Sequence, residues 1–210
     1  MLYKEGHVLK NDILLSIKAG FNGARLHEKV FEDRFHYWAD KLGYLTWAEF
    51  PNWGLNENAK ASEVSFMQEW PRIVHYLKNH PSIITWTPFN ETNTLECNAQ
   101  HKSLMRKAYN ITKKIDPTRP VNETSGFQHQ KTDIWTVHHY EPIPEILNKA
   151  LNPKKGVYRN FPQFETSYKK EPYIIDEYGG VWWLPNHLRK KIKPDYQILV
   201  NAGIVPVSYT

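Results

Sequence analysis

The sequence predicts an α/β protein in which short buried strands alternate with amphipathic helices. Apolar residues recur at intervals of four, three and four in the stretches 31–42, 66–77 and 104–115, as on one face of a helix. Runs rich in β-branched and aromatic residues separate these helices, and the repeat length is about thirty residues. Strands and helices that alternate at this spacing are typical of a parallel βα architecture.

The remaining elements follow from local signals along the chain. A short helix is predicted over 11–19, and Gly20 is placed to end it as a C-cap. Pro71 lies within the helix at 66–77, so that helix either begins at the proline or kinks there. Strands are expected at 21–27, 44–50, 83–87, 121–125, 133–139 and 173–176, with a further helix at 144–151.

Two of these strands lead directly to a glutamate. The segment HPSIITWTPFNET, residues 80–92, opens with a helix-ending His-Pro, continues as a buried strand and reaches Glu91 just beyond it. The segment EPYIIDEYGG, residues 171–180, has the same layout and leads to Glu177. Parallel-strand enzymes keep their catalytic groups at the carboxyl ends of the strands, so the pair predicts an active site.

The motifs Trp-x-Pro-x-Asn-Glu and Asp-Glu-Tyr-Gly-Gly in these two segments resemble glycoside hydrolase family 2, which includes β-galactosidases, β-glucuronidases and β-mannosidases. The segment GFNGARLHEKVFEDRFHYWADKLGYLTWAEFP, residues 20–51, resembles the second and third barrel strands of that family. The resemblance runs from about residue 12 to residue 183. It implies a TIM-barrel catalytic domain that hydrolyses terminal β-glycosidic bonds. Some members of the family use magnesium near the acid/base residue, but this chain gives no clear ligand set for it, so no cofactor is expected.

The separation of the two glutamates fits such a barrel. They are 177 − 91 = 86 residues apart, close to three βα units of about thirty residues each in a barrel of about 250 residues. If Glu91 ends the fourth strand, Glu177 ends the seventh. We therefore expect a partial (β/α)8 TIM barrel with roughly strands two to seven, in which the first strand is missing and no convincing eighth strand follows.

The resemblance also divides the chain. It predicts a partial glycosidase barrel at 1–185 and a divergent basic tail at 186–210, which we expect to be a frame-shifted or truncated end. The family's β-sandwich domains are missing, and we expect them in a full-length enzyme.

Glycoside hydrolysis needs a carboxylic acid that protonates the leaving oxygen and a carboxylate that faces the anomeric carbon. The resemblance makes Glu91 the acid/base residue and Glu177 the nucleophile of a retaining double displacement. The residues themselves support the pairing but do not assign the two roles. Asp176 is the weaker candidate, because neighbouring side chains on a regular strand point to opposite faces.

Further residues are expected to contact the sugar or the catalytic pair: Arg25, His27, Asn90, His138, Tyr140 and Trp182. The resemblance gives Asn90 a bond to the sugar 2-hydroxyl and places Tyr140 against the nucleophile, while Arg25 is expected to orient Glu177. A turn-forming Asn90 and an ordinary buried Tyr140 are the alternatives. Adjacent strand residues point to opposite faces, so His138 and His139 are not expected to share an ion, and no metal site is predicted.

Composition limits the class of protein. A hydrophobic share of 40% with 14% aromatic residues excludes a disordered chain. The eight Trp and twelve Tyr suit a carbohydrate partner, and a Trp-rich core accounts for most of them equally well. The single Cys97, and the lack of a signal peptide or membrane span, favour a cytoplasmic protein that does not act on membranes. Of the net charge of +5, 4 − 1 = +3 lies after Gly180, so no nucleic-acid partner is expected.

Two other functions stay open at this point. The chain could be an inactive truncated remnant or a carbohydrate-binding fragment, because an open barrel leaves sheet edges bare. A barrel amidase or esterase would need a nucleophile, a base and an orienting group together, and no such set is recognisable in the sequence.

Overall fold

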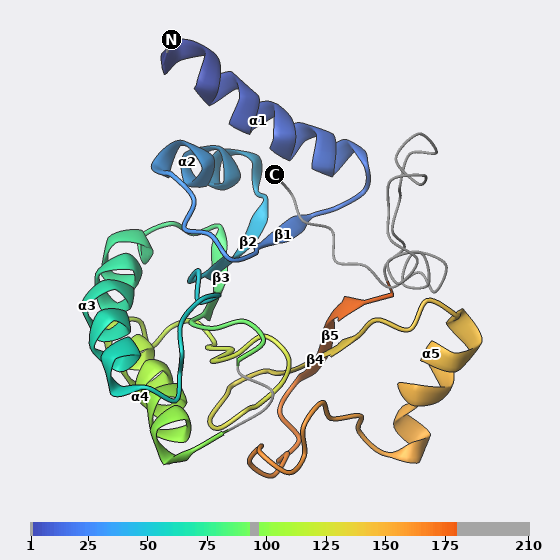
Figure 1. Ribbon diagram of the computed structural model, residues 1–210. Coiled ribbons are helices and arrows are strands. Elements are labelled where there is room, and N and C mark those ends of the chain that lie inside the picture. The colour runs from blue at the N-terminus through green and yellow to red at the C-terminus, as the bar shows by residue number, and fades with distance from the viewer. Residues whose placement is uncertain (1, 93–96, 180–210) are drawn as a thin grey trace, which may run out of the picture.

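The computed structural model describes residues 2–92 and 97–179, which form an α/β fold with parallel strands (Figure 1). The helices are α1 (Leu2–Lys18), α2 (Asp33–Leu42), α3 (Lys60–Leu77), α4 (Ala99–Ile115) and α5 (Pro144–Ala150), with a 3₁₀ turn η1 (Pro153–Lys155). The strands are β1 (Gly23–Leu26), β2 (Leu45–Glu49), β3 (Ile83–Thr87), β4 (Trp135–His139) and β5 (Tyr173–Tyr178).

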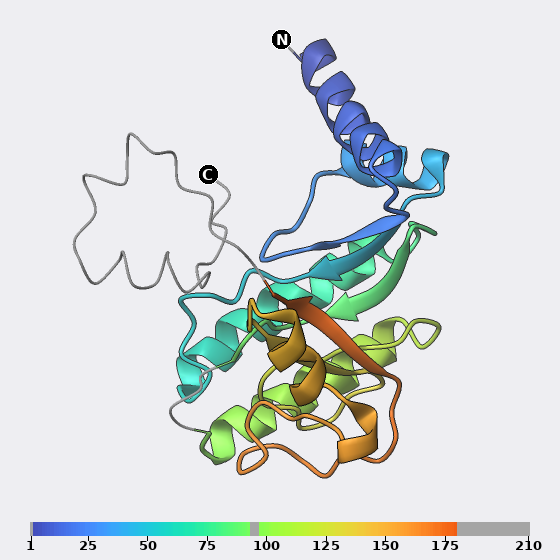
Figure 2. The same ribbon diagram turned by 90° about the vertical axis from the view of Figure 1, so that its right-hand side faces the viewer.

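The strands run parallel in two sheets that the segment 121–125 connects. One sheet has the order β1-β2-β3 and the other pairs β4 with β5. Isolated parallel bridges join β3 to the segment at Trp86–Val121 and, beyond the strand, at Asn90–Ser125. The strand arrows point to the same side of the molecule (Figure 2). The carboxyl ends therefore lie at one edge, as predicted.

The sheets are open in the part of the chain that the structure describes. The parallel order of the strands is confirmed, while the partial barrel and the division at residue 185 stay predictions. The expected eighth strand, the tail at 186–210 and Trp182 fall outside the described residues.

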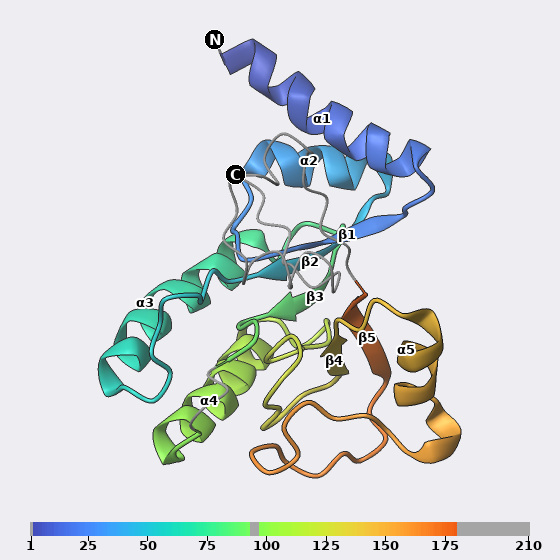
Figure 3. The same cartoon turned by 45° about the vertical axis from the view of Figure 1, so that its right-hand side comes forward.

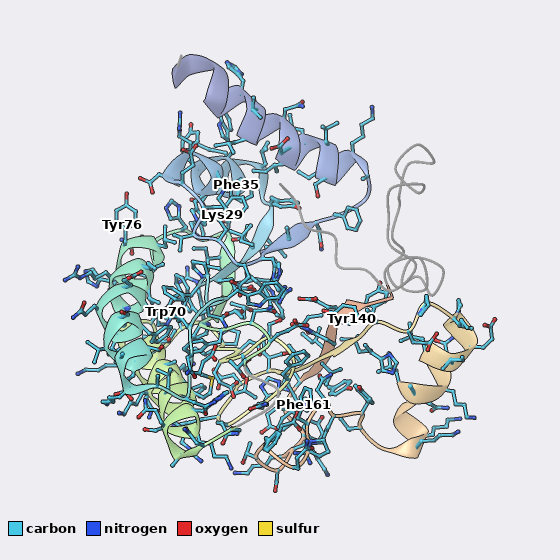
Figure 4. The ribbon with its side chains drawn as sticks, in the orientation of Figure 1. Lys29, Phe35, Trp70, Tyr76, Tyr140 and Phe161 are labelled. Carbon is cyan, nitrogen blue, oxygen red and sulfur yellow. The ribbon has the colours of Figure 1, made fainter. Side chains whose placement is uncertain are left out.

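The helices lie outside the strands and enclose two apolar cores. Helices α1 and α2 pack together beside β1, α3 and α4 pack together beside β3, and α5 lies near β4 and β5 (Figure 3). The larger core includes the fully buried Phe66, Trp70, Trp86 and Phe89, and Trp70 is labelled on α3 in Figure 4. None of the described helices is long and apolar enough to cross a membrane.

Three elements differ from the sequence prediction. Helix α1 begins at Leu2 rather than residue 11, and its Leu9 and Ile13 pack against the smaller core. Helix α3 spans Lys60–Leu77 and continues through Pro71, so the alternative in which it begins at the proline is wrong, while the kink stays a prediction. The segment 121–125 forms only isolated bridges and no regular strand.

Two buried histidines predict that the fold weakens in mild acid. Burial lowers the pKa of His36 and of His101 to about 4, and neither side chain is exposed. Because the unfolded chain binds these protons near pH 6.5, each contribution is full above pH 6.5 and is lost as the pH falls toward 4. The loss is about 3 kcal/mol per histidine.

Urea unfolding at pH 7 and pH 5 tests this expectation. His101→Leu should reduce the difference in unfolding free energy between the two pH values, whereas His75→Gln, at an exposed position on α3, should leave it unchanged. An equal pH difference in both variants would contradict the assignment to buried histidines.

Candidate active site

Glu91 and Glu177 lie close together at the carboxyl edge of the strands. Glu91 follows β3 and its backbone N–H donates to Ser125 O (3.0 Å), while Glu177 is the penultimate residue of β5. The Tyr140 hydroxyl lies within hydrogen-bonding distance of both carboxylates, 2.8 Å from Glu91 Oε1 and closer to Glu177 Oε2, so the two carboxylates share its single proton. An oxygen of Glu91 lies within 4.8 Å of an oxygen of Glu177. Figure 4 shows Tyr140 beside β5.

Arg25 contacts the other carboxylate oxygen of Glu177. Its guanidinium, at the end of β1, pairs with Glu177 Oε1 and donates to Asn90 Oδ1 (3.2 Å) and to Ser125 Oγ. Burial lowers the pKa of Arg25, but Glu49 and Glu177 outweigh it, so the pKa is raised. The guanidinium therefore carries its charge where it pairs with Glu177.

His138 lies between Glu91 and Asp176 and contacts both carboxylates. Its fully buried ring places Nδ1 at 2.6 Å from Glu91 Oε1 and Nε2 at 3.3 Å from Asp176 Oδ1. Burial lowers its pKa, yet hydrogen bonds with Asp176 and Glu91 raise the pKa to about 9. Gly126 makes room for the ring, because a Cβ there would stand 2.7 Å from the imidazole.

The protonation state of Glu91 follows from these neighbours. Burial raises its pKa, but hydrogen bonds from His138 and Tyr140 outweigh burial and the pKa is lowered. The free site therefore holds an ionised Glu91 against a protonated His138. One proton is shared across a short hydrogen bond, and the pair can present it to a leaving group.

Asp176 does not point away from Glu177, as a regular strand would require, while its place as the weaker catalytic candidate stays a prediction. The register between β4 and β5 shifts after Val137, so that His138 pairs with Glu177 and Asp176 falls in the irregular step. Asp176 consequently accepts a bond from Ser125 Oγ (2.6 Å) and faces the same imidazole as Glu177 does. Strict alternation fails where a bulge inserts a residue.

The other predicted residues gather at the same edge. His27 lies 3.0 Å from Glu49 Oε1 and 4.0 Å from Glu177 Oε1, and its pKa is raised mainly by the hydrogen bond with Glu49. Asn90 is buried, and its Nδ2 has no hydrogen-bond partner within the described residues. The structure thus brings five of the six expected contact residues together, and Trp182 lies outside the described residues.

Sequence analysis missed Glu49, Ser125 and Asn52. Glu49 ends β2 and lies 3.4 Å from Arg25 Nη1, and it also accepts a bond from the Glu28 backbone at 2.9 Å. The signal that pointed to Glu91, a carboxylate at the end of a buried strand, was present at Glu49 as well. Ser125 and Asn52 act through long-range contacts that no local pattern marks.

The esterase alternative would need a catalytic triad. One set of residues is connected in that way: Ser125, His138 and Glu91. Ser125 Oγ lies 3.1 Å from His138 Nε2 and Glu91 lies on Nδ1. However, Ser125 is fully buried and its hydroxyl donates to Asp176 instead. An imidazole with a pKa of about 9 is also protonated at neutral pH and cannot act as the base. The geometry does not support ester or amide hydrolysis.

Among the described residues, one group of residues of metal-binding types has its potential ligand atoms within 4.8 Å of one another: Glu91, His138 and Glu177. Their contacts already pair them: His138 Nδ1 bonds Glu91, and Tyr140 bonds both carboxylates. A protonated imidazole is no metal ligand. The absence of a metal and of a cofactor stays a prediction.

Comparison with known proteins places the chain in a family. The chain matches the model of "Glycosyl hydrolases family 2, TIM barrel domain" over residues 5–183. It is 27% identical over 186 residues to a β-glucuronidase of Bacteroides fragilis, covering 81% of this chain and 25% of that protein. It is 32% identical over 145 residues to a β-galactosidase of Psychromonas ingrahamii, covering 62% and 13%.

A solved structure agrees at the level of the fold. The β-D-glucuronidase of Dictyoglomus thermophilum superimposes with a TM-score of 0.66 at 18% identity, over 84% of this chain and 33% of that one. The chain spans about a quarter or less of the two relatives named above. Because the family model covers most of the sequence, the chain belongs to glycosyl hydrolase family 2 and corresponds to its TIM barrel domain.

Proposed function

We propose that Glu91 and Glu177 are the catalytic pair of a retaining β-glycosidase. The single observation that carries the proposal is the Tyr140 hydroxyl that bonds both carboxylates, with oxygens of the two lying within 4.8 Å. Retaining enzymes hold their carboxyl groups about 5–5.5 Å apart, whereas inverting enzymes leave about 6.5–9.5 Å for a water molecule. The short separation favours retention.

The first step would transfer the sugar to Glu177. A Glu177 oxygen attacks the anomeric carbon while the bond from that carbon to the leaving oxygen breaks. Glu91 passes to that oxygen the proton that it shares with His138. Arg25 pairs with the Glu177 carboxylate and holds it in position for the attack. The product is a glycosyl ester of Glu177 and a free alcohol.

The second step would release the sugar. Glu91, now ionised, takes a proton from water, whose oxygen attacks the anomeric carbon and displaces the Glu177 carboxylate. Tyr140 stabilises that departing carboxylate through the hydrogen bond it already makes. The buried Nδ2 of Asn90 is available for the sugar 2-hydroxyl, which supports the role that the family pattern gives to this residue.

The Glu91–His138 pair predicts an unusual pH profile. The pair keeps its one proton until the pH passes the pKa of His138, about 9, so the alkaline limb of kcat/KM is expected near pH 9. His138→Gln removes the imidazole that holds the shared proton. The alkaline limb of kcat/KM should then follow the ionisation of Glu91 alone and shift to a pH about two units lower or more.

A pH–rate profile of both proteins makes this measurement, with His139→Gln as the matched control. His139 contacts Tyr158 and the Glu141 backbone on the other face of β4, so its variant should keep the wild-type limb. An unshifted limb in His138→Gln would show that Glu91 does not draw its proton from this imidazole.

A panel of nitrophenyl β-glycosides tests the function itself. The glucuronide, galactoside, mannoside and glucoside are incubated with the full chain, and the anomer first released is followed by NMR. We expect turnover of at least one β-glycoside with the β-anomer released first. Release of the α-anomer, or hydrolysis that persists when both Glu91 and Glu177 are replaced, would contradict the proposal.

A further inference from the structure

A cavity of about 450 Å³ lies on one side of the catalytic pair. The loop after β2, residues 52–58, lines it together with Glu91, and Glu177 takes no part in the lining. In the proposed reaction the leaving group departs beside the acid, whereas the nucleophile approaches the anomeric carbon from the opposite face of the sugar. A cavity that includes Glu91 but not Glu177 is therefore placed for the leaving group.

The wall of this cavity is fixed to the catalytic strand. Asn90, next to Glu91, donates its backbone N–H to Asn52 Oδ1 (2.6 Å) and accepts a bond from Asn52 Nδ2 at its carbonyl (2.9 Å). Asn52 also donates to Glu57 Oε1 (3.2 Å), and the Trp53 backbone donates to Glu28 Oε2 (3.0 Å). A wall tied in this way needs little ordering when a ligand binds.

The lining chemistry suits a neutral, hydroxyl-rich ligand. Trp53 is 61% exposed and meets the His27 ring edge-on at 6.2 Å, so much of the indole is available to the apolar C–H face of a sugar. Asparagines supply amide groups that can bond hydroxyls. The charged lining residues are Glu57 and Glu91, both acidic, which disfavours an anionic ligand.

We propose, on the basis of the proposed function, that residues 52–58 form the leaving-group subsite and that Trp53 stacks on a neutral sugar there. The substrate is then a β-linked disaccharide or oligosaccharide whose leaving part is an uncharged sugar. Trp53 acts as a binding and specificity residue and takes no part in proton transfer.

Two donors with the same glycone separate this subsite from the catalytic centre. One is the β-glycosyl fluoride, which has no leaving sugar. The other is the disaccharide with that glycone β-1,4-linked to glucose, such as lactose or cellobiose, chosen by the preferred glycone of the aryl panel. In Trp53→Ala the ratio of kcat/KM for the disaccharide to kcat/KM for the fluoride should fall about tenfold, the effect of losing about 1.4 kcal/mol.

Phe21→Ala is the matched control, because Phe21 is an equally exposed aromatic residue (64%) that precedes β1 at the other end of the strand. Its ratio should equal that of the wild type. An unchanged ratio in Trp53→Ala, with both donors hydrolysed, would overturn the subsite and leave the proposed function standing. Failure of the wild type to hydrolyse any β-glycoside would instead contradict the proposed function.

A binding measurement decides the subsite without turnover. The disaccharide that carries the preferred glycone is mixed with Glu177→Gln, and saturation-transfer NMR reports which ring protons contact the protein. The glucose on the leaving side should receive saturation, and the added Trp53→Ala change should abolish it. Saturation confined to the non-reducing sugar, or no saturation of either sugar, would overturn the subsite and leave the proposed function standing.

Discussion

Glu177→Gln is expected to lower kcat/KM for every β-glycoside by about 10⁴-fold or more. The amide is no nucleophile, so the glycosyl ester cannot form, and removal of a covalent catalyst leaves only binding and the remaining polar groups. The substitution keeps the size of the side chain, but it also removes the negative charge that Arg25 meets. Steady-state kinetics on the preferred aryl glycoside give the loss.

The control for this variant is Glu171→Gln. Glu171 precedes β5, so it lies at the other end of that strand from Glu177, and its carboxylate accepts a bond from the Lys169 backbone (2.7 Å). That variant should retain wild-type kcat/KM. A Glu177→Gln enzyme within tenfold of the wild type would show that the nucleophile lies elsewhere.

Glu91→Ala is expected to give a loss that depends on the leaving group. A dinitrophenolate leaves without a proton, so its formation should be nearly spared in the first step, whereas a glycoside of a simple phenol should lose about 10²–10⁴-fold. Without the base, water attacks the glycosyl ester slowly and the intermediate accumulates. Kinetics with a series of aryl glycosides of rising leaving-group pKa show this dependence.

Azide adds a second, independent readout for the same variant. Azide is already an anion and needs no general base, so it should attack the glycosyl ester that accumulates in this variant. Turnover of the dinitrophenyl glycoside should then rise, and a β-glycosyl azide should form. The wild type should not respond to azide. Equal loss on good and poor leaving groups, with no azide product, would remove Glu91 from the acid/base role.

Much of this site could be predicted because its signals are local. Glu91 and Glu177 each follow a short apolar run, and parallel strands bring such ends to one edge. Arg25 at the end of β1 was found in the same way. The parallel arrangement of the strands could be predicted because strand and helix patterns alternate along the chain.

What could not be predicted depends on pairing between distant segments. The register shift opposite His138 brings Asp176 to the imidazole, and only the alignment of β4 with β5 reveals it. Ser125 was predicted in a strand but contacts Arg25, 100 residues away, by its side chain. Asn52, which secures the Asn90 backbone from 38 residues away, likewise carries no local signal.

Trapping the covalent glycosyl ester of Glu177 is the most direct test of the proposed retaining mechanism. A 2-deoxy-2-fluoro glycoside with a dinitrophenyl leaving group slows both steps, but its good leaving group lets the first proceed, so the glycosyl ester accumulates. Peptide mass spectrometry of the full chain should then find one added fluorosugar on the peptide that contains Glu177, and none in Glu177→Gln. A fluorosugar attached to another residue, or no adduct while the parent β-glycoside is still hydrolysed, would contradict the account.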